Sequence, residues 1–385
     1  MRTKRIKLPR SDQPKVVIPY RDHWEVAIHT EYFRKLSRTI EFHKYKLTTL
    51  ENFIADLEKN EVEGLWITEE LLDVFGDINK YVDCMPYTMT AFFVPWVGCE
   101  FLDMDLMQDN LIMVCNLGPH AAEEVSEIAV NLVISCFRMT TFWEHWFRNE
   151  HVGDIKNCKK YIGGSLSNSE DSKMPLQVQK GKVEDQLLDY SKNFKIGGKK
   201  VESLQKKTAL IVGFGSIGQN IGRKLKLAFN MKIIYFKRSG PISTKALGYK
   251  ARFCEDFDNP HTWKEADVII LSLPGGPSTE NIINKRIFSM CKQGVRVVNV
   301  GRGSVIQEED LLEALESGKV ASAGLDVFKN EEEMVNPKLI QRWDVTAYPH
   351  IGSTVADMIA KQTDITLANI EDIFVFSGNG KFPVY

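Results

Sequence analysis

The segment 206–239 constrains the fold of this chain more than any other part of its sequence. The apolar run 208–212 is short, as a fully buried parallel strand should be, and it leads into Gly213, Gly215 and Gly218 at the spacing GxGxxG. The first glycine allows a tight turn, the second lets the backbone approach a pyrophosphate, and the third allows a helix to pack closely on the strand. The segment therefore predicts a strand, a turn and a helix that bind a dinucleotide.

The helix is expected to begin near Ser216, so the N–H groups of its first turn, including that of Ile217, point at the pyrophosphate. A second apolar run, 232–236, follows the helix, as a strand–helix–strand unit requires. This context makes the glycine spacing much more specific than GxGxxG alone.

The end of the second strand bears on which dinucleotide binds. NAD-specific sites usually place an acid there to bond the adenosine ribose, whereas this chain has Lys237, Arg238 and Ser239. Two cations and a hydroxyl suit a 2′-phosphate, so we expect NADPH or NADP, with NAD as the less favoured cofactor. The alternative is a solvated basic turn.

Three polar residues, Arg302, Glu331 and His350, each lie just past a short apolar run. In a parallel sheet the residues that follow successive strands meet at one edge, where ligands bind. Arg can hold a carboxylate bidentately, His can move a proton near neutral pH, and Glu can orient and charge that His. The alternative is that they are three ordinary surface-loop residues.

Four segments carry a resemblance to a known family: VIILSLPGGPSTENIIN (268–284), VVNVGRGS (297–304), AGLDVFKNE (323–331) and PHIGST (349–354). On these motifs the chain resembles the D-isomer-specific 2-hydroxyacid dehydrogenases, over roughly residues 90 to 355 and most tightly from 206 to 353. The resemblance implies hydride transfer between a nicotinamide and the C2 atom of a small 2-keto or 2-hydroxy acid.

The resemblance also assigns roles to single residues. It makes Arg302 the catalytic arginine that also binds substrate, and it places Asp326 beside the nicotinamide. It makes His350 the acid/base and Glu331 its partner, although the run of three acids at 331–333 leaves that partner ambiguous by one residue. The backbone N–H of Gly98 is expected to receive the substrate carboxylate.

The expected cofactor-binding residues lie around the glycine turn and past the later strands. They are Gly213, Gly215, Ser216, Ile217, Gly218, Lys237, Arg238, Ser239, Leu273, Pro274, Thr279, Val300, Gly301, Asp326 and His350. Ketone reduction needs a hydride donor, a proton for the nascent alkoxide and positive charge for the carboxylate, which the cofactor, His350 and Arg302 would respectively supply. No metal is expected, because the seven cysteines are scattered without a CxxC pair.

The loop 97–105 departs from the family pattern, with Glu100 where a second glycine is usual and Leu102 where an Asp is usual. An anion beside a carboxylate-binding loop repels substrate unless it points away or pairs with a cation. This departure and a polar excursion at 147–205 support an alternative, a catalytically weak nucleotide-binding interaction protein like the corepressor relatives of the family. A formate dehydrogenase is less favoured, because those enzymes pair the catalytic His with Gln.

The expected fold class is α/β, with two doubly wound parallel-sheet domains of Rossmann and flavodoxin-like type. Residues 15–137 and 354–385 are expected to form a discontinuous substrate domain, into which a dinucleotide-binding domain, 138–353, is inserted. A polar insertion is expected at about 150–200, and one long helix at 119–146. The family uses that helix as a connector and dimer contact, which implies a homodimer.

Composition limits the remaining function classes. The 385 residues are 43% hydrophobic and carry a net charge of −2, which argues against general nucleic-acid binding. No apolar run reaches membrane-spanning length. An odd number of cysteines without a secretory signal favours the cytoplasm, with the nucleus and mitochondria left open. Residues 1–14 are expected to be a disordered basic tail.

Overall fold

The computed structural model describes residues 13–166, 178–181, 194–331 and 333–384. The chain folds into two compact units. Unit 1 comprises the chain up to Ala121 and again from Thr354, and unit 2 runs from Ala122 to Ser353. Residues 1–12 of the expected basic tail lie outside the described residues.

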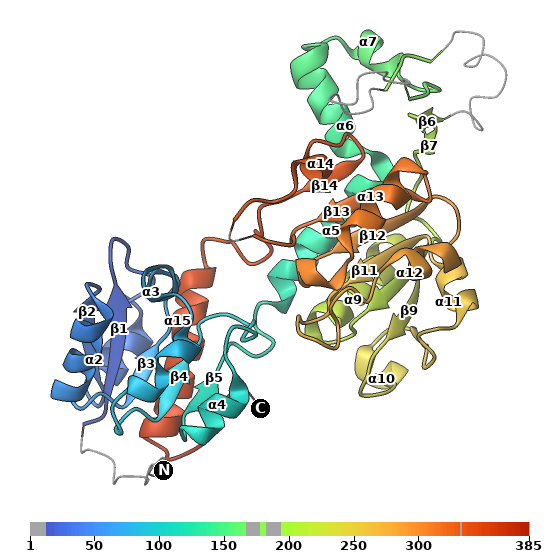
Figure 1. The fold of residues 1–385 in the computed structure, drawn as a ribbon. Helices are drawn as coiled ribbons and strands as arrows, with labels where there is room; N and C mark the ends of the chain where they lie inside the picture. Colours follow the sequence, from blue (N-terminus) through green and yellow to red (C-terminus); the bar gives the residue numbers. More distant parts are fainter. Residues whose placement is uncertain (1–12, 167–177, 182–193, 332, 385) are drawn as a thin grey trace. The chain divides into compact units, whose positions relative to one another are not determined.

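Unit 1 is built on a parallel five-stranded sheet in the order β2-β1-β3-β4-β5, which is the flavodoxin-like order (Figure 1). The five strands of this sheet alternate with helices along the chain. Their bounds are β1 Lys15–Tyr20, β2 Glu41–Lys46, β3 Gly64–Trp66, β4 Ala91–Phe93 and β5 Met113–Cys115.

Helices cover both faces of this sheet. One face packs against α1 and α15 through Phe33, Leu36, Leu367 and Ile370, and the other packs against α2, α3 and α4 through Phe53, Leu57, Leu71 and Met107. The helices are α1 Glu31–Leu36, α2 Leu50–Lys59, α3 Glu69–Phe75, α4 Met104–Asp109 and α15 Met358–Phe374, with 3₁₀ turns η1 Ile78–Lys80 and η2 Val82–Cys84. Threonine side chains cap the first turns of α1, α2 and α3, which explains where these helices begin.

Unit 2 is built on a parallel seven-stranded sheet in the order β10-β9-β8-β11-β12-β13-β14. Its first six strands follow the order typical of dinucleotide-binding folds. The strands are β8 Thr208–Val212, β9 Lys232–Phe236, β10 Arg252–Phe253, β11 Val268–Leu271, β12 Val295–Asn299, β13 Val320–Leu325 and β14 Val345–Ala347. This order confirms the doubly wound α/β class predicted from the sequence.

The helices of unit 2 also lie on both faces of its sheet (Figure 1). α5 Ala122–Arg138 and α9 Ser216–Phe229 cover one face, and α11 Pro260–Glu265, α12 Lys285–Met290 and α13 Glu308–Glu316 cover the other. The shorter helices are α10 Thr244–Leu247 and α14 Pro337–Ile340, and η4 Gly303–Val305 is a 3₁₀ turn.

The division between the units lies one helix earlier than the expected boundary at 137. Helix α5 belongs to unit 2 because its apolar face is buried against that sheet, through residues such as Leu132 and Cys136. The approach is close enough that a Cβ built on Gly324 of β13 would lie 2.9 Å from the Cβ of Leu132.

The single long helix expected at 119–146 is also wrong, because α5 ends at Arg138 and the chain turns at Met139. Met139 has left-handed backbone angles (φ 53°, ψ 44°), and α6 Thr140–His145 and a π-helical turn η3 Trp146–Glu150 follow it. The turn places Phe142, which is 1% exposed, in an aromatic cluster with Trp146, Tyr161 and Trp343. Of the described helices, none is by itself long and apolar enough to cross a membrane; α5 and Thr140–Glu150, bent by 74°, meet those requirements only as a pair.

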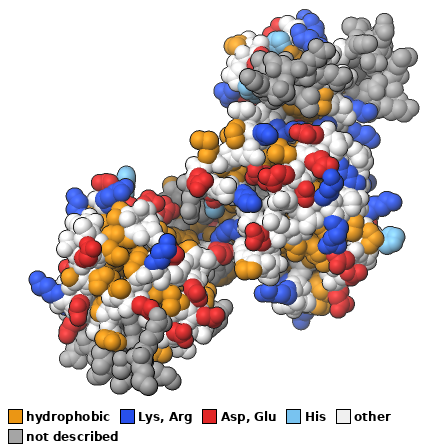
Figure 2. All heavy atoms as spheres, viewed as in Figure 1, with side chains coloured by type: hydrophobic (Ala, Val, Ile, Leu, Met, Phe, Trp, Pro, Cys, Tyr) orange, Lys and Arg blue, Asp and Glu red, His pale blue; other side chains and the backbone are white. Residues whose placement is uncertain are grey.

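The described parts of the polar insertion expected at about 150–200 contain regular structure. They include α7 Ile155–Lys159 and a hairpin of β6 Lys195–Ile196 and β7 Lys199–Lys200, while 167–177 and 182–193 lie outside the described residues. On the surface, side chains of both charge signs are interspersed over the visible face of each unit (Figure 2).

Candidate active site

The glycine turn between β8 and α9 has the backbone shape that a pyrophosphate needs. Gly213 has φ +91°, and a Cβ built there would lie 2.7 Å from the Ser272 carbonyl oxygen. A Cβ on Gly218 would lie 2.4 Å from the carbonyl oxygen of Gly213, so only glycine allows this approach of helix to strand. A Cβ on Gly215 would meet nothing within 4 Å, which leaves this position open to a ligand.

The first turn of α9, at Ser216 and Ile217, leaves backbone N–H groups without partners inside the helix. The N-cap residue, Gly215, has no side chain that could accept a hydrogen bond from them. The turn therefore fits a dinucleotide pyrophosphate. The predicted specificity residues lie at the same sheet edge, because β9 pairs in parallel with β8 and Phe236 lies opposite Val212.

At the end of β9 the Lys237 ammonium contacts the Ser239 hydroxyl, and Arg238 is exposed. The described segment from Lys237 to Gly240 holds no acidic side chain. These residues are thus free of a carboxylate neighbour in sequence, as a 2′-phosphate site requires.

The expected cofactor residues after β11 and β12 pack on one another. A Cβ built on Gly301 would lie 2.5 Å from the Leu273 carbonyl oxygen, so the two loops touch through backbone. Val300 is buried, and its N–H donates to the Leu271 carbonyl oxygen at 3.0 Å. The Thr279 hydroxyl donates to the carbonyl oxygen of Pro274 at 2.8 Å, which fixes the loop after β11.

Arg302, Glu331 and His350 follow β12, β13 and β14, which are neighbours in the sheet. His350 Nδ1 lies 2.8 Å from Glu331 Oε2, and the N–H of Phe328 donates to Glu331 Oε1 at 2.6 Å. Among the described residues, Glu331 is therefore the acid that contacts His350; Glu332 lies outside them. The Arg302 guanidinium donates to the Gly301 carbonyl oxygen at 2.8 Å.

The electrostatics of the trio suit proton transfer. The hydrogen bond with Glu331 and the negative charges of Glu331 and Asp326 raise the pKa of His350, although burial and the Arg302 charge act to lower it. Burial raises the pKa of Glu331, but hydrogen bonds from His350 and from the Phe328 N–H bring it below its ordinary value. The Arg302 charge lowers the pKa of both groups, so all three interact. The pair therefore favours an imidazolium beside a carboxylate.

Asp326 holds the loop that carries His350. Its carboxylate is buried, which raises its pKa, and it accepts hydrogen bonds from the N–H groups of Ile351 and Gly352, both at 2.9 Å. His350 has φ +52°, a left-handed conformation that costs a non-glycine residue about 1–2 kcal/mol. Such strain persists only where the surroundings fix it, and here the two hydrogen bonds to Asp326 do so.

Two polar residues that position the site were not among the predicted residues. Asn299, 1% exposed, donates through Nδ2 to the Arg302 carbonyl oxygen at 2.9 Å and accepts from the Gly301 N–H at 3.1 Å. Ser272 donates to the Gly213 carbonyl oxygen at 2.6 Å. The sequence could have indicated Asn299 and Ser272 by their positions, because each is a polar residue at or just past the end of an apolar strand.

The substrate loop expected around Gly98 lies in unit 1, so its place beside the trio stays a prediction. Within unit 1, Leu102 is 5% exposed and belongs to a core cluster with Met107 and Ile112. Glu100 is exposed. The Leu in place of the family's Asp is therefore a core residue.

The cysteines are free thiols, and five of the seven are buried, as expected for core residues. Among the residues that the structure describes, no group of three or more His, Cys, Asp or Glu side chains could hold a metal ion.

Comparisons with known proteins agree with this geometry. Residues 179–352 match the profile of the D-isomer specific 2-hydroxyacid dehydrogenase NAD binding domain. A Saccharomyces cerevisiae protein named provisionally as a 2-hydroxyacid dehydrogenase is 49% identical over 97% of this chain and 96% of its own length. The hydroxypyruvate reductase of Thermotoga maritima is 30% identical over 72% of this chain and 74% of its own.

Among solved structures, D-mandelate dehydrogenase of Rhodotorula graminis has the same fold, with a TM-score of 0.76 at 23% identity and coverage of 97% of this chain and 98% of that one. The Saccharomyces cerevisiae relative is aligned over nearly the whole chain, and the matched profile covers the glycine turn and the segments that carry the trio. The chain is therefore a member of the D-isomer-specific 2-hydroxyacid dehydrogenase family.

Proposed function

We propose that this protein reduces a small 2-keto acid, such as glyoxylate or hydroxypyruvate, to the 2-hydroxy acid with hydride from NADPH. Its family consists of NAD(P)-dependent oxidoreductases that act on CH–OH groups. The observation that carries the proposal is the 2.8 Å contact between His350 Nδ1 and Glu331 Oε2, at the sheet edge that also bears the glycine turn.

His350 is the proposed proton donor. Because Nδ1 faces Glu331, the other ring nitrogen, Nε2, remains to donate its proton to the substrate's carbonyl oxygen as that oxygen gains charge. The side chain is 49% exposed, so a substrate can reach it. Glu331 keeps the ring oriented and favours its protonated form.

Arg302 is the proposed carboxylate ligand. Its planar guanidinium can bond both oxygens of a 2-keto acid, and its charge stabilises the developing alkoxide. Asn299 fixes the backbone on either side of it through two hydrogen bonds. We propose that the Gly98 N–H supplies a further donor to the same carboxylate.

The cofactor, when bound, supplies the hydride. The glycine turn and the first turn of α9 would hold its pyrophosphate, and Lys237, Arg238 and Ser239 would hold a 2′-phosphate. The remainder of the cofactor site would be lined by the other expected residues, Leu273, Pro274, Thr279, Val300, Gly301 and Asp326. On the family's use of the α5 segment we further propose a homodimer, and on cysteine usage a cytoplasmic location.

The departure at Leu102 no longer supports the alternative function, a catalytically weak interaction protein. Leu102 packs into the core of unit 1, so this departure from the family pattern has a structural cause. The name of the Thermotoga maritima relative, a hydroxypyruvate reductase, supports a small substrate for this chain.

A panel of 2-keto acids from glyoxylate to phenylpyruvate, each mixed with the protein and NADPH or NADH, tests the proposal through the absorbance of the reduced cofactor. We expect at least one acid to be reduced, with kcat/KM for NADPH about tenfold or more above that for NADH. Failure of every acid while NADPH still binds would favour the interaction protein. A preference for NADH would refute only the proposed role of Lys237 and Arg238 in binding a 2′-phosphate, and would leave the reductase proposal standing.

The variant Arg302→Lys serves as a matched test of the carboxylate ligand. It retains the positive charge but loses the bidentate fork, so KM for the keto acid is expected to rise more than kcat falls. An unchanged KM would contradict the assigned role.

A further inference from the structure

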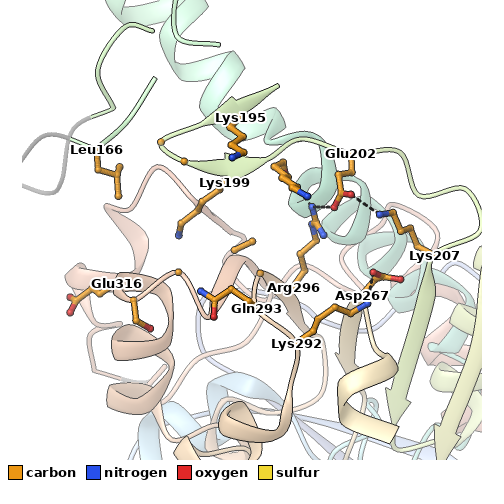
Figure 3. Close-up of a pocket in the computed structure, with 17 residues that line it drawn as sticks. Leu166, Lys195, Lys199, Glu202, Lys207, Asp267, Lys292, Gln293, Arg296 and Glu316 are labelled. Atoms are coloured by element: carbon orange, nitrogen blue, oxygen red, sulfur yellow. Dashed lines mark hydrogen bonds and ion pairs between the residues drawn. The ribbon is translucent and has the colours of Figure 1, made fainter. Parts of the chain in front are cut away.

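A polar cavity of about 650 Å³ opens at the edge of the unit 2 sheet opposite the candidate active site. Residues just before four strands line it, namely Lys207 before β8, Asp267 before β11, Gly294 before β12 and Gly318 before β13. The β6–β7 hairpin forms another wall (Figure 3). Its volume lies within the range of small-molecule sites.

Positive charge dominates this cavity. Of the described residues that line it, three are carboxylates and six are cationic, an excess of three positive charges in a chain whose net charge is −2. The carboxylates are Glu202, Asp267 and Glu316, and the cations are Lys195, Lys199, Lys200, Lys207, Lys292 and Arg296.

Four of the six cations have protein partners. Lys207 and Arg296 both pair with Glu202, at 2.6 and 2.9 Å, and Lys292 pairs with Asp267 at 2.7 Å. The buried Lys199 pairs with Asp344 and donates to the Leu315 carbonyl oxygen. Two cations, Lys195 and Lys200, make no ion pair among the described residues.

The hairpin places these two lysines directly opposite each other. β6 and β7 are antiparallel, and Lys195 is the register partner of Lys200. Side chains in that relation start about 5 Å apart at Cβ and lie on the same face, so two like charges there destabilise the hairpin. The fold gives no reason for this arrangement, whereas an anion between the two ammonium groups would.

The hairpin packs closely on unit 2. Its turn residues Gly197 and Gly198 have φ +52° and +76°, as a two-residue type I′ turn requires. A Cβ built on Gly197 would lie 2.6 Å from the Trp343 ring, so the turn packs tightly on that side chain. The Lys199 ammonium lies 5.4 Å from the centroid of the same ring. The two lysines thus lie next to a turn that packs against unit 2.

We propose that this cavity binds a small polyanion, a molecule with two or more carboxylate or phosphate groups, through Lys195 and Lys200. Lys195 and Lys199 extend from the hairpin toward the cavity, and Lys292 and Gln293 come from the opposite wall (Figure 3). Because the glycine turn lies at the other edge of the sheet, the ligand is distinct from the cofactor.

Calorimetric titration of the full chain with citrate, and separately with inorganic pyrophosphate, tests this site. NADPH is kept saturating so that neither anion binds at the glycine turn, and every chain titrated also carries Arg302→Ala so that no carboxylate is held at the candidate active site. We expect one anion per chain, with a Kd about tenfold or more weaker in Lys195→Gln/Lys200→Gln. The matched control Lys264→Gln/Lys338→Gln removes two exposed lysines of the same unit outside the cavity and should bind as the unaltered chain does.

Thermal unfolding gives a second readout. Without anion, Lys195→Gln/Lys200→Gln should unfold at a higher temperature than the unaltered chain, because the opposed charges are gone. The preferred anion should raise the Tm of the unaltered chain and leave that of the double variant unchanged. If citrate binds and pyrophosphate does not, the ligand is a polycarboxylate. If pyrophosphate binds and citrate does not, the ligand is a phosphorylated molecule. Equal affinity in the double variant, or no binding of either anion at millimolar concentration, overturns the proposal.

Discussion

Replacing His350 with Asn separates the proposed proton donor from the backbone that carries it. His350 has φ +52°, a conformation in which Asn is enriched and Ala is strained. The ion pair between His350 and Glu331 joins side chains that are 49% and 33% exposed, so after solvent screening it stabilises the fold by about 1 kcal/mol or less. Glu331 keeps the hydrogen bond from the Phe328 N–H. The free energy of unfolding should therefore change by no more than about 1 kcal/mol.

The catalytic effect of His350→Asn should be much larger. A positioned general acid contributes roughly 10²–10⁴-fold in rate, which is about 3–5 kcal/mol of transition-state stabilisation. We expect kcat for keto-acid reduction to fall by that factor, while NADPH affinity from fluorescence titration falls far less, since His350 is one contact of the expected cofactor set and the glycine turn is untouched. The assay follows the absorbance of NADPH with the best acid of the panel.

Thermal unfolding of the same variant excludes a trivial loss of structure. A folded variant that binds NADPH and keeps more than about a tenth of the original kcat would refute the assignment, because tenfold corresponds to only about 1.4 kcal/mol.

Three further changes test other parts of the site. Glu331 raises the pKa of His350, so the protonated His350 is available below that raised pKa and the reduction rate should fall as the pH rises through it. In Glu331→Gln this fall in rate should begin at a lower pH. A pH profile that does not move would contradict the role of Glu331. Lys237→Ala/Arg238→Ala should weaken NADPH binding about tenfold or more and leave NADH binding unchanged, measured by titration; equal losses for both cofactors would count against a 2′-phosphate site. Gly218→Ala puts a Cβ 2.4 Å from a backbone oxygen, so it should lower both Tm and dinucleotide affinity, and an unaffected affinity would show that the turn is not used.

The strands of unit 2 were predictable because burial on both faces leaves them little choice of residue. β8, β11, β12 and β13 are buried along their whole length, and an apolar run bounded by polar residues is the direct consequence. The break at Met139 was not predictable, because the apolar spacing of 119–146 continues through it. Packing of Phe142 against residues distant in sequence, such as Trp343, determines the turn.

The candidate site was predictable where it depends on topology and not where it depends on loop hydrogen bonds. Arg302, Glu331 and His350 gather because each follows a strand of one parallel sheet. The support from Asp326 to the backbone of the His350 loop, and from Asn299 to that of Arg302, depends on how those loops fold back.

The fate of the transferred hydride distinguishes a keto-acid reductase from a protein that only binds the nucleotide. NADPH carrying deuterium at its transferable position is incubated with the protein and the best keto acid, and the product is analysed by mass spectrometry. We predict a 2-hydroxy acid with one deuterium at C2 from the unaltered chain, and a yield at least about a hundredfold lower in equal time from His350→Asn. Bound NADPH without labelled product from any acid of the panel, or equal labelling by the variant, would contradict this prediction.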